Sequence, residues 1–304
     1  MASYVKGNLV LQSLSTKSVL SLTALAMALS STTALAKDIL TATPVTYMLA
    51  TELTKGTELT TEYLPPKRYG VSRLPNWFSN QGAEATEKAA KEATVALTLG
   101  AVWAADPLYV HARQGNINII EVDASQAISP RATGVAALRL DDGSLSPFAW
   151  LNPSNLSRMA AIVSDDLQRV WPEQAAVINK NQQSLMVNVR QLINQQQQQL
   201  IEANIDSVIL LSTELEDFAS GNQLFVVDRL TTPELEWTDK DKANLKSALE
   251  EDETLWVLTT RKMSAQLKSL VPNAERVLVI DSVDRWGRAG IDTKAPLKRW
   301  QLAL

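Results

Sequence analysis

The middle of the chain most constrains its fold, because it contains two long helical patterns that separate two stretches of alternating strands and helices. From Pro153 to Val170, apolar residues recur three and four positions apart, and Asn152 can cap the first turn. Pro172 interrupts this pattern, and a second helix is predicted from about Glu173 to Ala203. At 1.5 Å per residue that helix would be roughly 45 Å long, which is enough to run along two domains.

The sequence before these helices alternates between short apolar strands and helical segments. Strand patterns occur at 38–44, 60–64, 94–101 and 117–122, and helical patterns occur at 45–54, 84–92 and 106–113. Pro65 and Pro66 end the second strand, because a central strand does not accept proline. This alternation predicts a mainly parallel sheet with helices on both faces.

The same alternation resumes after Asn204. Strands are predicted at 208–211, 224–227, 254–259 and 276–280, and a helix is predicted at 239–250. The predicted fold is therefore α/β, with two lobes of mainly parallel sheet flanked by helices and joined by one long backbone helix. The expected lobes are 37–150 and 204–304, with the helical segment 151–203 between them. A ligand is expected in the crevice between the lobes, at the carboxyl ends of the strands.

The amino terminus has the pattern of a signal peptide over residues 1–36. Lys6 and Lys17 precede an apolar run from Val19 to Leu29, and small residues follow up to Ala34-Leu35-Ala36. The apolar run is shorter than the roughly 20 residues that a helix needs to cross a bilayer. No cysteine follows the cleavage site to carry a lipid. We therefore expect a free periplasmic protein and not a lipoprotein.

Charge and motif content argue against two further classes of protein. The net charge is -4, so no basic excess indicates nucleic-acid binding. The chain has one histidine and lacks a glycine-rich phosphate loop, a G-x-S-x-G elbow and an H-E-x-x-H motif. The carboxylate pairs at 141–142 and 165–166 are interpreted as surface charge and not as a catalytic acid and base. The sequence does not indicate an enzyme.

Several segments, taken in order, resemble one known family. The segments are ATPVTYMLATELTKG after the first strand, the strand-ending Leu64–Pro66, VALTLGAVWAADPLYVHAR, SPFAWLNPSNLSRMAAIVSDDLQRVWPEQAAVINKN from Ser146 to Asn181, ILLSTELEDFASGNQLFVV and VLVIDSV. Together they resemble the periplasmic receptors of ABC importers that bind zinc or manganese. The resemblance implies a receptor that delivers a metal ion or another small solute to an ABC permease in the inner membrane. We expect it to be a monomer.

The resemblance also implies a metal site of three histidines and a carboxylate, with zinc or manganese as the cargo. At the corresponding positions this chain has Gly70 to Arg73, Phe148, Ser212 and Asp281. Only Asp281 keeps a ligand type, and it is a weak metal candidate alone, since zinc sites need three or four donors at about 2.0 to 2.3 Å. A tight transition-metal site of the family type is therefore not expected.

A site of carboxylates alone stays open as an alternative. Such a site would favour harder cations such as manganese or magnesium, and its acids would come from residues near Asp281. The candidates are Glu214, Glu216, Asp217 and Asp228. The competing interpretation is that these acids form solvated loops and helix caps.

The residues that stand at the family's ligand positions suggest a different cargo. Arg73 and Arg285, with Lys67, Arg68 and Arg288 nearby, could bring cations to the cleft, and arginine binds carboxylates and phosphates through two parallel hydrogen bonds. The aromatic residues Trp77, Phe78, Phe148, Trp150 and Trp286 could form its walls. The other interpretation is that the arginines pair with Asp281 and Asp284 and close an empty cleft.

These observations lead to one functional prediction and two alternatives. The chain is predicted to be the periplasmic solute-binding protein of a metal-type ABC importer, with an altered or lost metal site. The alternatives are a diverged envelope protein that acts through protein partners, and a receptor for an anionic organic solute. The candidate cleft residues are Arg73, Phe148, Ser212, Asp281 and Arg285.

Two other features are interpreted as structural. The lone His111 lies on a predicted helix away from the cleft, where a surface or core-edge position is more common than a ligand role. The five glutamines from Gln195 to Gln199 lie within the long helix. Because glutamine is a good helix former, this run is interpreted as a solvated helix surface and not as a partner-binding face.

Overall fold

The computed structural model describes residues 1, 38–128, 133–271 and 273–304. The predicted signal peptide, apart from Met1, lies outside the described residues. Residues 37–304 form one compact unit. In the described part of that unit, no helix is both long enough and apolar enough to cross a membrane.

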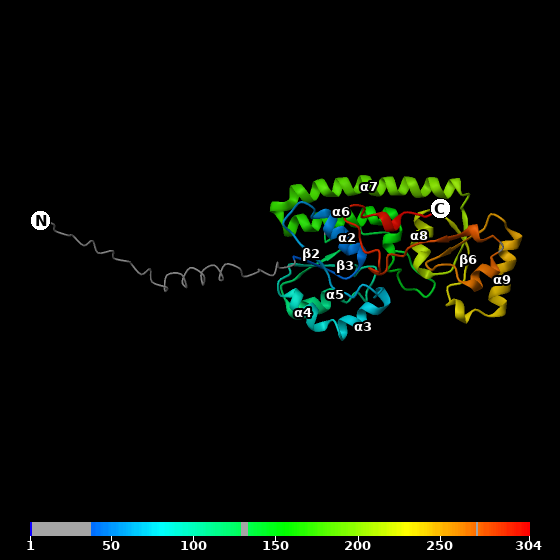
Figure 1. Ribbon diagram of the computed structural model, residues 1–304, viewed down its shortest axis with the longest axis horizontal. Coiled ribbons are helices and arrows are strands. Elements are labelled where there is room, and N and C mark those ends of the chain that lie inside the picture. The colour runs from blue at the N-terminus through cyan, green and yellow to red at the C-terminus, as the bar shows by residue number, and fades with distance from the viewer. Residues whose placement is uncertain (2–37, 129–132, 272) are drawn as a thin grey trace. The chain divides into compact units, whose positions relative to one another are not determined.

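Two sheets of four parallel strands form the framework (Figure 1). The first sheet has the order β2-β1-β3-β4 and the second has the order β6-β5-β7-β8, and every strand pairing is parallel. The strands are β1 (Ile39–Thr41), β2 (Thr61–Tyr63), β3 (Val95–Thr98), β4 (Ile120–Asp123), β5 (Ser207–Leu210), β6 (Phe225–Arg229), β7 (Trp256–Thr259) and β8 (Val277–Val279). The predicted α/β fold with two parallel sheets is confirmed.

Helices cover these sheets. They are α2 (Pro44–Leu53), α3 (Leu74–Ser79), α4 (Ala83–Ala90), α5 (Leu108–Gly115), α6 (Pro153–Val170), α7 (Ala175–Glu202), α8 (Glu216–Gly221), α9 (Asp239–Glu251) and α10 (Ala265–Leu270). In Figure 1, α2, α6 and α7 lie on one side of the first sheet, and α3, α4 and α5 lie on the other. The first sheet is therefore covered on both faces, as a parallel sheet requires.

The two central helices begin and end where the sequence predicts. The Asn152 side chain caps α6 by accepting hydrogen bonds from the amides of Ser154 and Asn155. Pro172 separates α6 from α7, and α7 continues for 28 residues and joins the two lobes. The contacts of α7 with α6 and α2 place it along the first lobe, and its carboxyl end leads directly to β5.

Two polar residues of these helices are buried, although the sequence indicated surface positions. Gln196, in the glutamine run, is 2% exposed, and Asp166 is 1% exposed. Gln196 is buried because its side-chain amide donates a 2.7 Å hydrogen bond to the carbonyl of Trp300. Asp166 accepts a 2.8 Å hydrogen bond from the guanidinium of Arg169, one turn farther along α6. The solvated-surface interpretation is therefore wrong for these two side chains.

A chain of buried hydrogen bonds joins α7 to the end of the second sheet. Gln196 binds the carbonyl of Trp300, and the Trp300 indole donates to the carbonyl of Trp150 over 3.0 Å. The Trp150 indole in turn donates to the carbonyl of Ser282 over 2.9 Å. Because Ser282 follows β8 and Trp150 precedes α6, these bonds fix the chain after the second sheet against the helices.

The C-terminal segment, residues 281–304, returns from the second sheet to the first lobe. The Trp286 ring packs edge-on against Tyr47 of α2, at 4.8 Å between ring centroids. It also packs at a tilt against Tyr63 of β2, at 4.7 Å between ring centroids. The amide of Gly287 donates a 2.7 Å hydrogen bond to the carbonyl of Lys67, in the loop after β2. The C-terminal segment thus connects the last strand of the second sheet to side chains and backbone of the first lobe.

The first prediction concerns the buried amide of Gln196. Replacing it in Gln196→Leu leaves the buried carbonyl of Trp300 without its donor, so we expect the free energy of unfolding to fall by about 1–3 kcal/mol. The matched control is Gln197→Leu, the same change at the next and exposed position of the glutamine run. The control should change the free energy of unfolding by less than about 0.5 kcal/mol. Urea unfolding curves that show equal losses for both variants would contradict the role of this hydrogen bond.

A second prediction concerns Asp217 of α8, which is 1% exposed and has one carboxylate oxygen without a hydrogen-bond partner. Burial raises its pKa to about 6, against a weaker opposing effect of a hydrogen bond with Ser146. A carboxyl whose pKa is raised on folding favours the protonated folded state. Its stabilising effect is present below pH 4 and is lost as the pH rises through about 6.

We therefore expect Asp217→Asn to gain stability relative to the unmodified chain as the pH rises from 4 to 7. The gain should be on the order of 3 kcal/mol, because each pKa unit corresponds to about 1.4 kcal/mol. The control Asp239→Asn makes the same change at an exposed position of α9. Thermal unfolding measured across this pH range should separate the two variants, and parallel curves for all three proteins would contradict the prediction.

Candidate functional site

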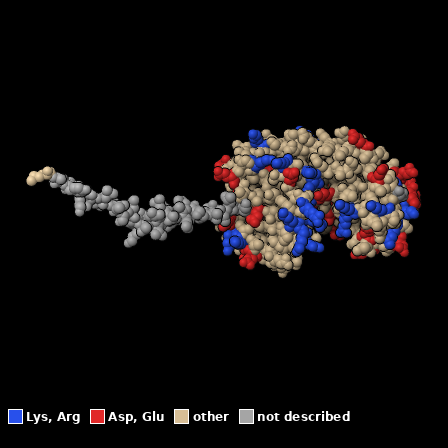
Figure 2. Space-filling view, in the orientation of Figure 1, with Lys and Arg blue, Asp and Glu red and all other residues tan. Residues whose placement is uncertain are grey.

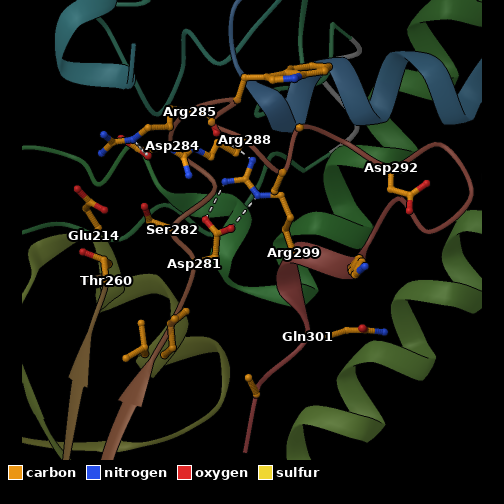
Figure 3. A pocket seen from close by; sticks show the side chains of 18 of the residues that line it. Glu214, Thr260, Asp281, Ser282, Asp284, Arg285, Arg288, Asp292, Arg299 and Gln301 are labelled. Atoms are coloured by element: carbon orange, nitrogen blue, oxygen red, sulfur yellow. Dashed lines mark hydrogen bonds and ion pairs between the residues drawn. The ribbon is translucent and has the colours of Figure 1, made fainter. Parts of the chain in front are cut away.

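A cavity with a volume of about 990 Å³ lies at the carboxyl ends of β5, β7 and β8, beside the C-terminal segment (Figure 3). Glu214 lines it from the loop after β5, and Thr260, Arg261 and Lys262 line it from the loop after β7. The remaining lining residues belong to 279–303. The strand order β6-β5-β7-β8 makes the chain leave β5 and β7 in opposite directions, and such a switch point is where parallel sheets bind ligands.

Asp281, the residue that the sequence suggested as a metal candidate, is held by an arginine. The Arg299 guanidinium donates two hydrogen bonds to its carboxylate, from Nε to Oδ2 at 2.7 Å and from Nη2 to Oδ1 at 2.8 Å. Oδ1 also accepts the amide of Val283 at 2.8 Å. Figure 3 shows this two-bond pair at the centre of the cavity wall. Both oxygens of Asp281 are therefore engaged within the chain.

Asp284 fills the space beside Gly70, the first residue of the loop where the family resemblance places a histidine. A Cβ atom added at Gly70 would collide with the Asp284 carboxylate. Asp284 also accepts a 2.8 Å hydrogen bond from Nε of Arg285. Any side chain at position 70 would have to displace the Asp284 carboxylate from its present position.

The backbone between these acids adopts an unusual conformation. Val283 is fully buried and has φ of 54°, in the left-handed region that a β-branched residue rarely enters. Its conformation turns the chain between Asp281 and Asp284, so that one acid faces Arg299 and the other faces the first lobe. Strained residues of this kind persist where surrounding packing fixes them, commonly at ligand sites.

Glu214 contributes a further carboxyl group to the cavity, from the loop after β5. Burial raises the pKa of the Glu214 carboxyl, and the nearby negative charge of Asp284 raises it further. A hydrogen bond with the Ser282 hydroxyl and the charges of Arg285 and Arg261 act in the opposite direction. Glu214 is the only one of the four additional acid candidates that lines this cavity.

The other three acid candidates lie elsewhere. Glu216 is buried and pairs with Arg229 through hydrogen bonds of 2.6 and 3.1 Å. Asp217 is buried near Ser146, and Asp228 is exposed on β6. Glu216 and Asp217 were expected to be solvated, and this expectation is wrong, because both side chains are buried in the first turn of α8.

The five candidate cleft residues fall into three groups. Asp281 and Arg285 line the cavity together. Ser212 lines a smaller cavity of about 250 Å³ that shares Glu214 and residues 260–262 with the larger one, and its hydroxyl accepts the amide of Glu214 at 3.3 Å. Arg73 is exposed on the first lobe, and Phe148 packs against Trp150 at 5.2 Å between ring centroids. Neither Arg73 nor Phe148 lines the larger cavity.

Sequence reasoning missed Arg299, the residue that holds Asp281. Arg299 is separated from Asp281 by 18 positions and no local pattern connects them. Arginine pairing with Asp281 and Asp284 was one expected arrangement, and for Asp284 the partner is Arg285, as that interpretation required. For Asp281 the partner comes instead from a turn near the end of the chain.

A metal centre is not assembled from these side chains. Across residues 38–128, 133–271 and 273–304, no group of three or more histidine, cysteine, aspartate or glutamate residues could hold a metal ion. His111 lies on α5 next to Phe78, at 5.9 Å between ring centroids, and does not line the larger cavity. The cavity instead combines carboxylates with arginine and lysine side chains.

Comparison with known proteins identifies relatives of this architecture. A family model described as "Zinc-uptake complex component A periplasmic" (ZnuA) matches residues 79–293, which is more than half of the 304 residues. No curated protein is significantly similar to the chain in sequence.

Several solved structures share the fold. The crystal structure of ZnuA has 18% sequence identity and a TM-score of 0.61, and the match covers 82% of this chain and 92% of that one. The AdcAII protein of Streptococcus pneumoniae has 14% identity and a TM-score of 0.61, with coverage of 88% and 96%. The metal-dependent lipoprotein YcdH of Bacillus subtilis has 13% identity and a TM-score of 0.65, with coverage of 85% and 91%. At these identities the similarity shows a common fold.

A prediction follows from the different geometry of the two arginine pairs. Arg299 donates two hydrogen bonds to Asp281, whereas Arg285 donates one to Asp284. Arg299→Lys keeps the charge but loses the paired hydrogen bonds to Asp281, so we expect the free energy of unfolding to fall by about 1–2 kcal/mol. The matched change Arg285→Lys should cost less than about 1 kcal/mol, because Arg285 makes a single hydrogen bond with its partner and its own side chain is half exposed.

Urea unfolding of the two lysine variants and of Asp281→Asn would test this order. In the double variant Arg299→Lys/Asp281→Asn, the losses should be less than additive, since both changes remove the same pair. Equal losses for Arg299→Lys and Arg285→Lys, or fully additive losses in the double variant, would contradict the central role of the Asp281–Arg299 pair.

Proposed function

The chain belongs to the family of the periplasmic component A of zinc-uptake complexes, and on that premise we propose that it is a receptor with an altered solute site. Members of this family are metal-binding components of ABC importers, and this chain has the same general role in such an importer. We propose further that it presents its solute, as a monomer, to an ABC permease in the inner membrane. The two lobes with their connecting helix support this role, because they carry a cavity at the carboxyl ends of strands.

The observation that carries the proposal is that Arg299 donates hydrogen bonds to both carboxylate oxygens of Asp281. A zinc or manganese ion at this position would have to displace Arg299 from both carboxylate oxygens. It would also need further donors, and glycine, phenylalanine and serine stand at or near the family's other ligand positions. Side chains of these types do not supply the nitrogen, sulfur or carboxylate donors of a zinc site. The residues present therefore do not fit a family-type metal site.

The proposed location of the protein is the periplasm. The pattern of residues 1–36 supports export and cleavage after Ala36, and the absence of a cysteine after that position supports a form without a lipid anchor. Amino-terminal sequencing of the protein recovered from the periplasm would test this. A mature terminus at Lys37 is expected, and an uncleaved chain retained with membranes would overturn the proposed location.

The metal proposal predicts weak binding of bare transition metals. After chelator treatment and removal of the chelator, titration with zinc or manganese should show no stoichiometric binding at sub-micromolar concentrations. The unfolding temperature should not rise in the presence of either ion, because a ligand stabilises only the state that binds it. Elemental analysis of untagged protein should find less than one equivalent of either metal.

A positive control variant sharpens this test. Arg299→Gln removes the guanidinium from both oxygens of Asp281, so any weak affinity for manganese or magnesium should increase in this variant and disappear in Arg299→Gln/Asp281→Ala. One equivalent of zinc bound tightly by the unmodified protein, and lost in Asp281→Ala, would overturn the altered-site proposal. Such a result would indicate that the protein binds its metal as other members of the family do.

A further inference from the structure

We propose that the 990 Å³ cavity at the carboxyl ends of β5, β7 and β8 binds a small solute through its oxyanion groups, which are carboxylates or phosphates. This inference rests on the proposed role as a receptor with an altered site, and it adds the chemical class of the solute. The residues that would contact the oxyanion are Arg261, Lys262, Arg288 and Lys298.

The first argument is the balance of charges in the cavity wall. Six cationic side chains and four carboxylates line it, although the whole chain has a net charge of -4. Arg285 and Arg299 are already paired with Asp284 and Asp281. The other four cations have no ion-pair partner within 4.0 Å among the residues that the structure describes. Figure 2 shows Lys and Arg side chains gathered near the middle of the face that it draws.

The carboxylates of the wall cancel only part of this positive charge. Asp281 and Asp284 are paired with arginines, which leaves Asp292 and Glu214 against the four unpaired cations. Burial raises the pKa of Glu214. The Ser282 hydroxyl, which also lines the cavity, could donate a hydrogen bond to a bound oxyanion.

The second argument is the position of the cations in the fold. Arg261 and Lys262 follow β7 directly, in a loop on one side of the switch point between β5 and β7. Arg288 and Lys298 come from the C-terminal segment, which approaches the same cavity from the side of the first lobe. Cations from two separate parts of the chain therefore converge on one cavity, as they would around a bound anion.

The third argument is the size and rigidity of the cavity. A volume of about 990 Å³ lies at the upper end of the roughly 300–1,000 Å³ that small-molecule sites occupy. Trp286 forms part of its wall and is fixed between Tyr47 and Tyr63. Gly290 has φ of 61°, and a Cβ atom there would lie 2.7 Å from the Trp286 indole nitrogen, so glycine is required for this packing. The wall is thus preformed for a ligand.

The test is calorimetric titration of the full mature chain with three probes at low ionic strength. The probes are inorganic phosphate, citrate, and citrate in complex with zinc. We expect binding of one equivalent of at least one probe, weakened by added salt as charge pairing requires. In Arg288→Gln and in Arg261→Gln, the dissociation constant of that probe should rise about tenfold, since each variant loses one charge-assisted hydrogen bond.

The matched control is Arg190→Gln, which makes the same change in charge at an exposed position of α7 outside the cavity. Its dissociation constant should stay within about twofold of that of the unmodified chain, and all three variants should keep the unfolding temperature of the parent. Equal weakening by Arg190→Gln and Arg288→Gln would overturn the inference, because it would indicate unspecific attraction of anions to the surface.

The three probes separate the sources of the oxyanion. Stronger binding of phosphate assigns a phosphorylated solute, and stronger binding of citrate assigns a carboxylate solute. Tighter binding of zinc citrate than of citrate alone assigns a metal delivered as an anionic complex. Absence of binding for every probe at about 10 mM overturns the inference and leaves the altered-site proposal intact, whereas tight binding of bare zinc overturns the altered-site proposal itself.

Discussion

The structure depends on the buried hydrogen bonds that tie the C-terminal segment to the helices. Gln196, Trp300 and Trp150 form a continuous series that ends at the carbonyl of Ser282. A buried carbonyl without a donor is costly, so each of these partners fixes the position of the next. Since Ser282 follows the last strand of the second sheet, this series sets where the chain leaves that sheet. Arg285, Arg299 and the contact with the first lobe all lie on the chain beyond this point, and they form one wall of the cavity.

The same segment supports the proposal of an altered solute site. Parallel sheets place their functional side chains at the carboxyl ends of strands, and here β8 delivers Asp281 and Asp284 to that edge. Arg299 returns to Asp281, and Asp284 occupies the space beside Gly70. Each of the two acids is paired with an arginine of the C-terminal segment. The family fold is kept, while both acids are engaged by contacts within the chain.

Much of the fold could be predicted because its elements have local causes. Proline and asparagine set the beginning of α6, and the three- and four-residue spacing of apolar side chains sets its buried face. The alternation of short apolar strands with helices identified both parallel sheets. The errors occurred where a polar residue is buried by a distant partner. Gln196 and Asp217 have ordinary surface composition in sequence, and only the packing of the C-terminal segment and of α8 makes them buried.

The sequence by itself determined the α/β class, the two sheets and the long connecting helix. These properties follow from residue type and spacing, which act over a few positions of the chain. The tertiary structure decided which charges meet. Arg299 pairs with Asp281 across 18 positions, while Arg261 and Arg288 converge on one cavity from different segments. Ion pairs act through space over a few ångströms, so their partners are set by how the chain packs and not by their order in the sequence.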